Sequence, residues 1–369
     1  MKKTVLSVVP LAVLAAIAAE TIPANPEPSL REAAGRIGLL VGVAVDPVHF
    51  SEAAYAGTLA REFNMVEPEN VMKWRHTEPA RGQFDFDPGD QVVAFAKAHQ
   101  MRVRGHNLLW AVRNPAWLAG GHFTAPELRE IMHQHIARVS GHYAGKVFAW
   151  DVVNEAFDGH GRLSHSIWFD QPGIGLAGQG TAYIEQAFRW AREADPKALL
   201  FYNDYAAEGP NAKSDAIYAM VKDFRRRGVP IDGVGLQMHL SLQKAATGSS
   251  LASLDANISR LAGLGLQVHI TEMDVGLPLG ADGQPSDPAG AQRQADLYGQ
   301  VARACATNPG CTAFQTWGFT DKYSWIPVFT HGQGGAGLLF DAEYKPKLSY
   351  DAVLKAFESV ERPPGRPAQ

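Results

Sequence analysis

Eight short apolar runs, rich in β-branched residues, recur along the chain with helical patterns between them. Within each run the apolar positions are nearly continuous rather than alternating, which is typical of parallel strands covered by helices. The runs therefore predict eight buried strands, at residues 37–45, 63–69, 101–110, 146–153, 198–205, 233–240, 266–275 and 311–319.

The stretches between the runs carry helix-start signals. Ser29 with Glu32, and Thr124 with Glu127, have the spacing of a capping box. Eight alternations of strand and helix predict an α/β fold, a single-domain (β/α)8 TIM barrel. A doubly wound open sheet is the alternative, but no G-x-G-x-x-G motif follows the first run, which disfavours it.

Polar and aromatic side chains gather where the predicted strands end. In a barrel the C-terminal ends of the strands meet at one mouth, where active sites form. Because polar groups at so many strand ends are hard to explain as core packing, we predict a functional site at this mouth. Its candidate residues are Glu69, Asn70, His106, Trp110, Asn154, Glu155, Asn203, Asp204, Tyr205, Gln237, His239, Glu272, Asp274 and Trp317.

Two of these residues, Glu155 and Glu272, end the fourth and seventh predicted strands, which face each other across a barrel mouth. Burying an acid costs free energy, which suggests that it acts there. One acid of such a pair can protonate a leaving group while the other captures the carbon left behind, and a separation of roughly 5–5.5 Å permits retaining glycoside hydrolysis. We expect Glu155, beside Trp150 and Phe157, to be the protonated acid. Membership of a structural ion pair is the alternative role for either glutamate.

Charge and composition narrow the possible partners. The 369 residues carry a formal net charge of −4, without a basic run or an acidic tail. We therefore expect no nucleic-acid partner. His133 and His135 lie two residues apart on a predicted helix and face different sides, so they are poor metal ligands. We expect neither a metal nor a cofactor.

The N-terminus has the pattern of an export signal. Lys2 and Lys3 precede an apolar run that ends in small residues, which predicts a signal peptide at residues 1–19 and a secreted or periplasmic protein. A membrane anchor is the alternative, but the run is short and Pro10 interrupts it. We expect a disordered lead-in at 20–29, the catalytic barrel at 30–358 and a disordered tail at 359–369. The mature protein is expected to be a monomer away from the membrane.

Cys305 and Cys311 are the only cysteines and flank the turn signal ATNPG. In an oxidising compartment their spacing suits a disulfide across a helix-to-strand turn. Loop closure predicts a stabilisation of roughly 2–3 kcal/mol at most. Two isolated cysteines do not make a zinc site.

Seven runs resemble, in order, the motifs of family 10 glycoside hydrolases, the endo-β-1,4-xylanases. The resemblance covers nearly all the chain from about residue 30 to 357. A single motif of this kind is weak evidence, but seven in order are strong. The runs are FNMVEPENVMKW (63–74), GHNLLW (105–110), DVVNEAF (151–157), FYNDY (201–205), GLQMHL (235–240), ITEMD (270–274) and WGFTDKYSW (317–325).

The resemblance implies retaining endo-hydrolysis of β-1,4-xylosidic bonds, with Glu155 as acid/base and Glu272 as nucleophile. His239 and Asp274 would orient and tune the nucleophile. The substrate would be xylan or a xylo-oligosaccharide, bound through polar side chains and through aromatic rings that face the C–H faces of the sugars. The implied substrate-binding residues are Glu69, Asn70 and Lys73 on the glycone side, His106, Trp110, Asn154, Gln237 and His239 around the reacting sugar, Tyr205 on the aglycone side, and Trp317 and Trp325 over the glycone side.

Four positions depart from the family's usual pattern. Ala111 stands where a His is usual, Glu67 where a small or apolar residue is usual, Ala206 in place of Asn and Ile326 in place of Arg. None is one of the two carboxylates, so these departures bear on affinity and subsite strength rather than on reaction class.

Two other functions remain open from the sequence. One is a related barrel glycosidase acting on β-1,4-glucan. The other is a catalytically silent polysaccharide-binding barrel, which would keep Trp317 and Trp325 but would not need both glutamates. Because both glutamates are present, an endo-1,4-β-xylanase is the prediction.

Overall fold

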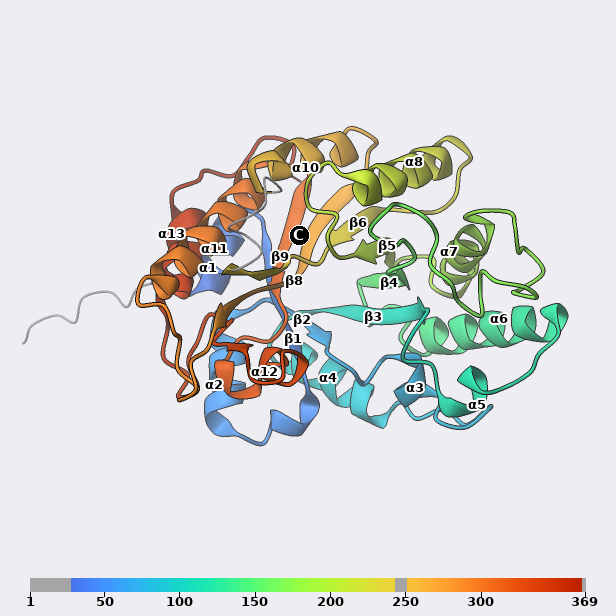
Figure 1. Cartoon of the computed structure of the whole chain (residues 1–369), viewed down its shortest axis with the longest axis horizontal. Helices are drawn as coiled ribbons and strands as arrows, with labels where there is room; N and C mark the ends of the chain where they lie inside the picture. The colour runs from blue at the N-terminus through green and yellow to red at the C-terminus, as the bar shows by residue number, and fades with distance from the viewer. Residues whose placement is uncertain (1–27, 243–250, 367–369) are drawn as a thin grey trace, which may run out of the picture.

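A closed ring of parallel strands forms the centre of the molecule in the computed structural model, which describes residues 28–242 and 251–366 (Figure 1). Pairing between the seventh and eighth barrel strands completes the ring, so the predicted barrel is confirmed. The barrel strands are β1 (Leu40–Val45), β2 (Met65–Pro68), β3 (Arg102–Trp110), β4 (Ala149–Asn154), β5 (Leu199–Asp204), β6 (Gly233–Leu236), β8 (Gln267–Pro278) and β9 (Cys311–Thr316).

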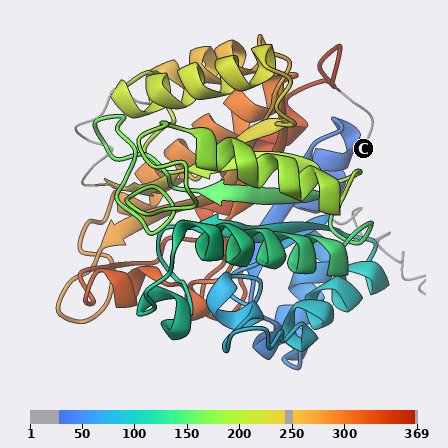
Figure 2. The same ribbon diagram turned by 90° about the vertical axis from the view of Figure 1, so that its right-hand side faces the viewer.

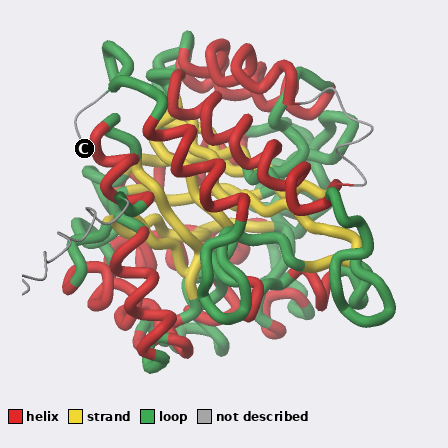
Figure 3. Tube along the Cα trace, turned by 90° about the vertical axis from the view of Figure 1, so that its left-hand side faces the viewer, coloured by secondary structure: helices red, strands yellow, loops and turns green. Residues whose placement is uncertain are grey.

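Helices cover the outside of this ring, and each of the predicted strands is found (Figure 3). Figure 2 shows α6 and α7 side by side on the outer surface. Both predicted capping boxes, at Ser29 and Thr124, are formed. The helices are α1 (Leu30–Arg36), α2 (Ala53–Glu62), α3 (Trp74–Thr77), α4 (Asp87–Ala98), α5 (Ala116–Ala119), α6 (Ala125–His142), α7 (Ala182–Ala194), α8 (Ala212–Arg226), α10 (Leu254–Ala262), α11 (Gly290–Thr307), α12 (Ile326–Phe329) and α13 (Leu348–Glu358), with short 3-10 turns at Pro47–His49, Leu251–Ser253 and Asp321–Tyr323.

Two short strands extend the mouth of the barrel, β7 (His239–Ser241) and β10 (Gly334–Gly335). The predicted strand at 233–240 is therefore two strands. Met238, with φ of 66°, breaks it because this left-handed conformation cannot continue a strand. The break lets β7 pair with β8 so that His239 lies opposite Asp274.

The predicted signal peptide and residues 20–27 of the lead-in lie outside the described residues. None of the helices within residues 28–242 and 251–366 is long and apolar enough to cross a bilayer. The predicted disulfide joins Cys305 to Cys311 across the turn between α11 and β9.

The C-terminal segment differs from its prediction as a disordered tail, because its Arg366 is docked against the end of α11. Arg366 is only 4% exposed, and its Nη2 lies 2.8–2.9 Å from the carbonyl oxygens of Cys305, Ala306 and Asn308. Carbonyls at a helix C-terminus have no partner within the helix, and the helix dipole favours a cation there. This contact at the end of α11 explains the order of a Pro-rich segment.

Replacing Arg366 with Ala is expected to lower the free energy of unfolding by about 2–3 kcal/mol, because it removes a buried charged donor from several carbonyls. Denaturant titration measures the change. Lys222→Ala, an exposed position on α8, is the control and should stay within about 0.5 kcal/mol of wild type. Equal stability of the two variants would show that the C-terminal segment does not dock.

Candidate active site

The two predicted catalytic acids lie in the barrel mouth and are connected by amide side chains. Glu155 directly follows β4, and Glu272 lies in β8 with 4% of its surface exposed. Nδ2 of Asn203 donates to Oε1 of Glu272 at 2.7 Å and to Oδ1 of Asn154 at 2.9 Å. Nδ2 of Asn154 in turn donates to Oε1 of Glu155 at 3.1 Å. Two amide side chains therefore fix one acid relative to the other.

Glu155 accepts three side-chain hydrogen bonds. Its Oε1 accepts from Asn154 and, at 3.0 Å, from Nε2 of Gln237, and its Oε2 accepts from Nε1 of Trp110 at 3.1 Å. The residue also has φ of 55°, a left-handed backbone conformation that costs free energy for a residue with a Cβ. The backbone is strained at the residue whose carboxyl group points into the mouth.

We expect Glu155→Gly to be more stable than Glu155→Ala by about 1 kcal/mol, because Gly adopts positive φ without a steric penalty. Both variants lack the carboxyl group and should be inactive, so denaturant titration isolates the backbone effect. The same pair of substitutions at Glu193, an exposed position on α7, is the matched control. There the order should reverse, with Ala more stable by roughly 1 kcal/mol. If the Ala variant is more stable than the Gly variant at both positions, the backbone at Glu155 is not strained.

Glu272 has different partners from Glu155. Nε2 of His239 lies 3.1 Å from Oε2 of Glu272, and Nδ1 lies 2.9 Å from Oδ2 of Asp274. Burial alone would lower the pKa of His239, but the charge of Asp274 and the hydrogen bonds to both acids outweigh it and raise the pKa to about 10. Burial would likewise raise the pKa of Glu272, but His239, His106 and Lys73 together lower it. These three groups therefore favour the ionised form of Glu272.

Removing the cation beside Glu272 should move the acidic limb of the pH dependence of kcat/KM toward higher pH in His239→Asn. Without His239 the pKa of Glu272 rises, so its carboxylate becomes protonated at a higher pH than in wild type. Rates measured across the acidic range test this. His165→Asn removes an exposed histidine and should leave the limb in place. If the acidic limb does not move in His239→Asn, His239 does not control the ionisation of Glu272.

The predicted glycone-side residues form one cluster after β2. Nζ of Lys73 lies 3.1 Å from Oδ1 of Asn70, and it is 5.4 Å and 5.2 Å from the ring centroids of Trp110 and Trp317. Burial raises the pKa of Glu69, although the Lys73 charge opposes this rise. A cation thus sits between two indole rings and two polar side chains.

Two indole rings and two imidazole rings complete the wall of the site. The rings of His106 and Trp317 lie 5.3 Å apart, and those of His239 and Trp325 lie 5.0 Å apart. Nε1 of Trp325 donates to Oδ2 of Asp274 at 2.7 Å, which connects Trp325 to Glu272 through Asp274 and His239.

Tyr205 stands apart from the other predicted residues. It is 44% exposed, and Nζ of Lys213 lies 3.5 Å from its ring centroid. Lys213 is buried and pairs with Asp204 at 2.6 Å. Burial raises the pKa of Asp204 to about 7, against the opposing effects of Lys213 and Tyr202. The candidate residue Asp204 is therefore a buried partner of Lys213, whose ammonium group lies against the ring of Tyr205.

Two residues that shape this site, Asn203 and Lys213, were given no role by the sequence analysis. Asn203 was noted as a polar strand end, but its contact with both halves of the site depends on residues 49 and 69 positions away. Lys213 lies on α8 in an ordinary helical pattern, and the sequence carries no signal that would place it at Tyr205.

Within the described residues, Glu67, His106 and Glu272 have the spacing of a metal site, with ligand atoms within 4.8 Å of one another. Glu67, one of the departures from the family pattern, already accepts from Nε of Arg104 at 3.0 Å, and Nδ1 of His106 lies 3.0 Å from Asp151. The charge of Arg104 disfavours a further cation at this point. Glu67 and His106 therefore belong to a buried network with Arg104 and Asp151, and Glu272 pairs with His239.

Comparison with known proteins agrees with this geometry. A family model described as Glycosyl hydrolase family 10 matches residues 29–356. The chain belongs to glycosyl hydrolase family 10. Endo-1,4-beta-xylanase B of Thermotoga neapolitana is 42% identical over 332 residues, which are 89% of this chain and 91% of that protein.

Solved structures of the family have the same fold. Xylanase 10B from Thermotoga petrophila RKU-1, in complex with xylobiose, is 42% identical with a TM-score of 0.83, over 90% of this chain and 97% of that one. Native xylanase 10B from Thermotoga maritima is 41% identical with a TM-score of 0.82, over 90% and 98%. The eight-stranded barrel of this family member is thus shared with solved family 10 enzymes.

Proposed function

We propose that this family 10 protein is a retaining endo-1,4-β-xylanase that cleaves xylan by double displacement. The observation that carries the proposal is the contrast between the surroundings of the buried Glu272 and those of the half-buried Glu155. Glu272 lies against a protonated imidazole, whereas Glu155 is held by N–H groups of neutral side chains. This contrast separates a nucleophile from an acid/base.

In the first step, Glu155 donates its proton to the glycosidic oxygen while the carboxylate of Glu272 attacks the anomeric carbon. The bond to the leaving sugar breaks, and a glycosyl ester forms on Glu272. Its negative charge disappears with the ester, so the electrostatic reason for Glu155 to hold a proton weakens.

In the second step, Glu155 removes a proton from water, and the resulting oxygen attacks the anomeric carbon. The ester bond breaks and Glu272 regains its charge beside His239. Two displacements at one carbon restore the original configuration.

The substrate class rests on two kinds of support. The relatives named above are xylanases, and one was solved with xylobiose. The site itself presents indole rings for C–H faces and amide, lysine and histidine groups for hydroxyls. A β-1,4-linked xylose chain fits this combination.

We also propose that the enzyme acts outside the cytoplasm as a monomer. The pattern of residues 1–19 supports export, and the Cys305–Cys311 disulfide suits an oxidising compartment. Fractionation of cells that express the full chain tests the location, and sedimentation of the mature enzyme tests its oligomeric state.

Reducing-sugar release from xylan and from carboxymethyl cellulose tests the proposed activity. Wild type should cleave xylan, and Glu155→Ala and Glu272→Ala should each lower kcat by at least about 10²–10⁴-fold. Glu193→Ala, which removes an exposed acid on α7, should keep wild-type activity. After incubation with a 2-deoxy-2-fluoro-β-xylobioside, mass spectrometry should find the adduct on Glu272.

Other outcomes point to the alternatives left open by the sequence. Binding of xylan without cleavage would favour a polysaccharide-binding barrel. Cleavage of glucan alone would favour a β-1,4-glucanase, and an adduct on Glu155 would reverse the two roles.

A further inference from the structure

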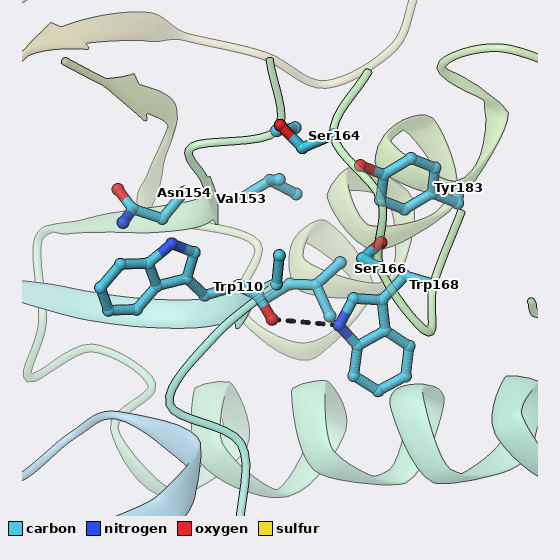
Figure 4. A pocket seen from close by; sticks show the side chains of 10 residues that line it. Trp110, Val153, Asn154, Ser164, Ser166, Trp168 and Tyr183 are labelled. Carbon is cyan, nitrogen blue, oxygen red and sulfur yellow. Dashed lines mark hydrogen bonds between the residues drawn. The ribbon is translucent and has the colours of Figure 1, made fainter. Parts of the chain in front are cut away.

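A buried tryptophan outside the sugar-binding set, Trp168, is connected to the acid/base through Trp110 (Figure 4). We propose that Trp168 is a positioning residue that fixes the direction in which Glu155 delivers its proton. This inference rests on the proposed glycosidase function and adds a residue to it.

The hydrogen bonds on Glu155 identify the oxygen that carries the proton. Each carboxyl oxygen offers about two acceptor sites. Those of Oε1 are occupied by Asn154 and Gln237, whereas Oε2 accepts only from Trp110. The transferable proton therefore belongs on Oε2. The N–H of Trp110 then decides which side of Oε2 remains for that proton.

The position of this N–H depends on how the end of β3 is held. Trp110 is the last residue of β3, and its backbone carbonyl accepts from Nε1 of Trp168 at 3.1 Å. A second donor, Nδ2 of Asn114, is more distant at 3.4 Å. The next residue, Ala111, has no polar side chain with which to help. Trp168 is thus the closest side-chain donor to this carbonyl.

Packing leaves space beside Trp110 on the side that faces Trp168. A cavity of about 10 Å³ lies there, which is at most the size needed for one water molecule. Because packing at this cavity is incomplete, the hydrogen bond from Trp168 adds a restraint on the strand end that packing alone does not give. The lining includes Trp110, Ala111, Ser164, Ser166, Trp168 and Tyr183.

Trp168 itself is rigidly held. It is 1% exposed and stacks on Trp74 with ring centroids 5.2 Å apart and planes inclined by 15°. Trp74 stacks on His135 at 3.6 Å, and its Nε1 donates to Glu78 at 2.9 Å. A donor fixed in such a stack can hold a strand end without a large further loss of side-chain entropy.

The segment that carries Trp168 begins at the acid/base itself. Residues 155–181 leave the end of β4 and return across the end of β3 before α7. A turn at Ser166 sets the return, since Oγ of Ser166 accepts from the backbone N–H of Phe169 at 3.1 Å. The acid/base and the residue that positions its partner are therefore on one continuous loop.

Hydrolysis of two aryl β-xylobiosides by Trp168→Phe tests the proposal, because Phe keeps an aromatic ring and loses the N–H. The phenolate of phenyl β-xylobioside needs a proton to leave, whereas 2,4-dinitrophenolate does not. We expect kcat/KM to fall about five- to tenfold for the phenyl substrate and less than about twofold for the dinitrophenyl substrate. Trp190→Phe, at a buried tryptophan on α7, is the matched control and should leave both values unchanged.

The outcomes separate this inference from the proposed function. Equal losses on the two substrates would reduce Trp168 to a structural residue, and no loss on either would also overturn the proposal. If wild type hydrolyses neither compound, the proposed glycosidase function fails instead. Should Trp168→Phe not fold, hydrogen exchange of the Trp168 indole N–H in wild type decides. Slow exchange supports its bond to Trp110, and exchange as fast as that of an exposed indole contradicts it.

Discussion

Two carboxyl groups share one barrel mouth, and the site depends on giving them opposite surroundings. Two like charges in a buried pocket repel each other, so one acid holds a proton unless positive charge compensates. His239 supplies that charge to Glu272 and is itself kept protonated by Asp274. Glu155 has only neutral donors. The asymmetry arises from β7, whose pairing with β8 puts His239 beside the nucleophile.

The barrel makes this asymmetry possible by bringing several strand ends to one place and leaving room for amide side chains. Asn203 can bridge the two halves of the site because β6 has Gly235 beside it. A Cβ at Gly235 would lie 2.1 Å from Oδ1 of Asn203, so no larger residue fits without displacing the amide. Oγ1 of Thr271 donates to that same oxygen at 2.8 Å, which turns the N–H groups of Asn203 toward Asn154 and Glu272.

The sequence predicts the barrel because parallel strands covered by helices leave near-continuous apolar runs. It predicts most of the mouth because polar residues stand out at the ends of those runs. Contacts between distant side chains leave no such pattern. The support of Tyr205 by Lys213 and the tie between Trp168 and Trp110 are of this kind. Composition likewise predicts a disordered tail, whereas Arg366 in that segment binds backbone carbonyls about sixty residues earlier in the chain.

Below the mouth, the carboxyl group of Glu67 has an oxygen within 4.8 Å of a carboxyl oxygen of Glu272. Nε of Arg104 binds Glu67, its guanidinium also pairs with Asp151, and Nη1 lies 2.7 Å from Nδ1 of His269. Burial and the nearby Arg104 charge lower the pKa of His269, so its neutral ring can accept from Arg104. Arg104 thus contacts the carboxyl groups of both Glu67 and Asp151. Burial and the charge of Asp151 raise the pKa of Glu67, and the charge of Arg104 opposes this rise. The ionised form of Glu272 is therefore stabilised from both sides, by His239 and Lys73 in the mouth and by His106 beside this network.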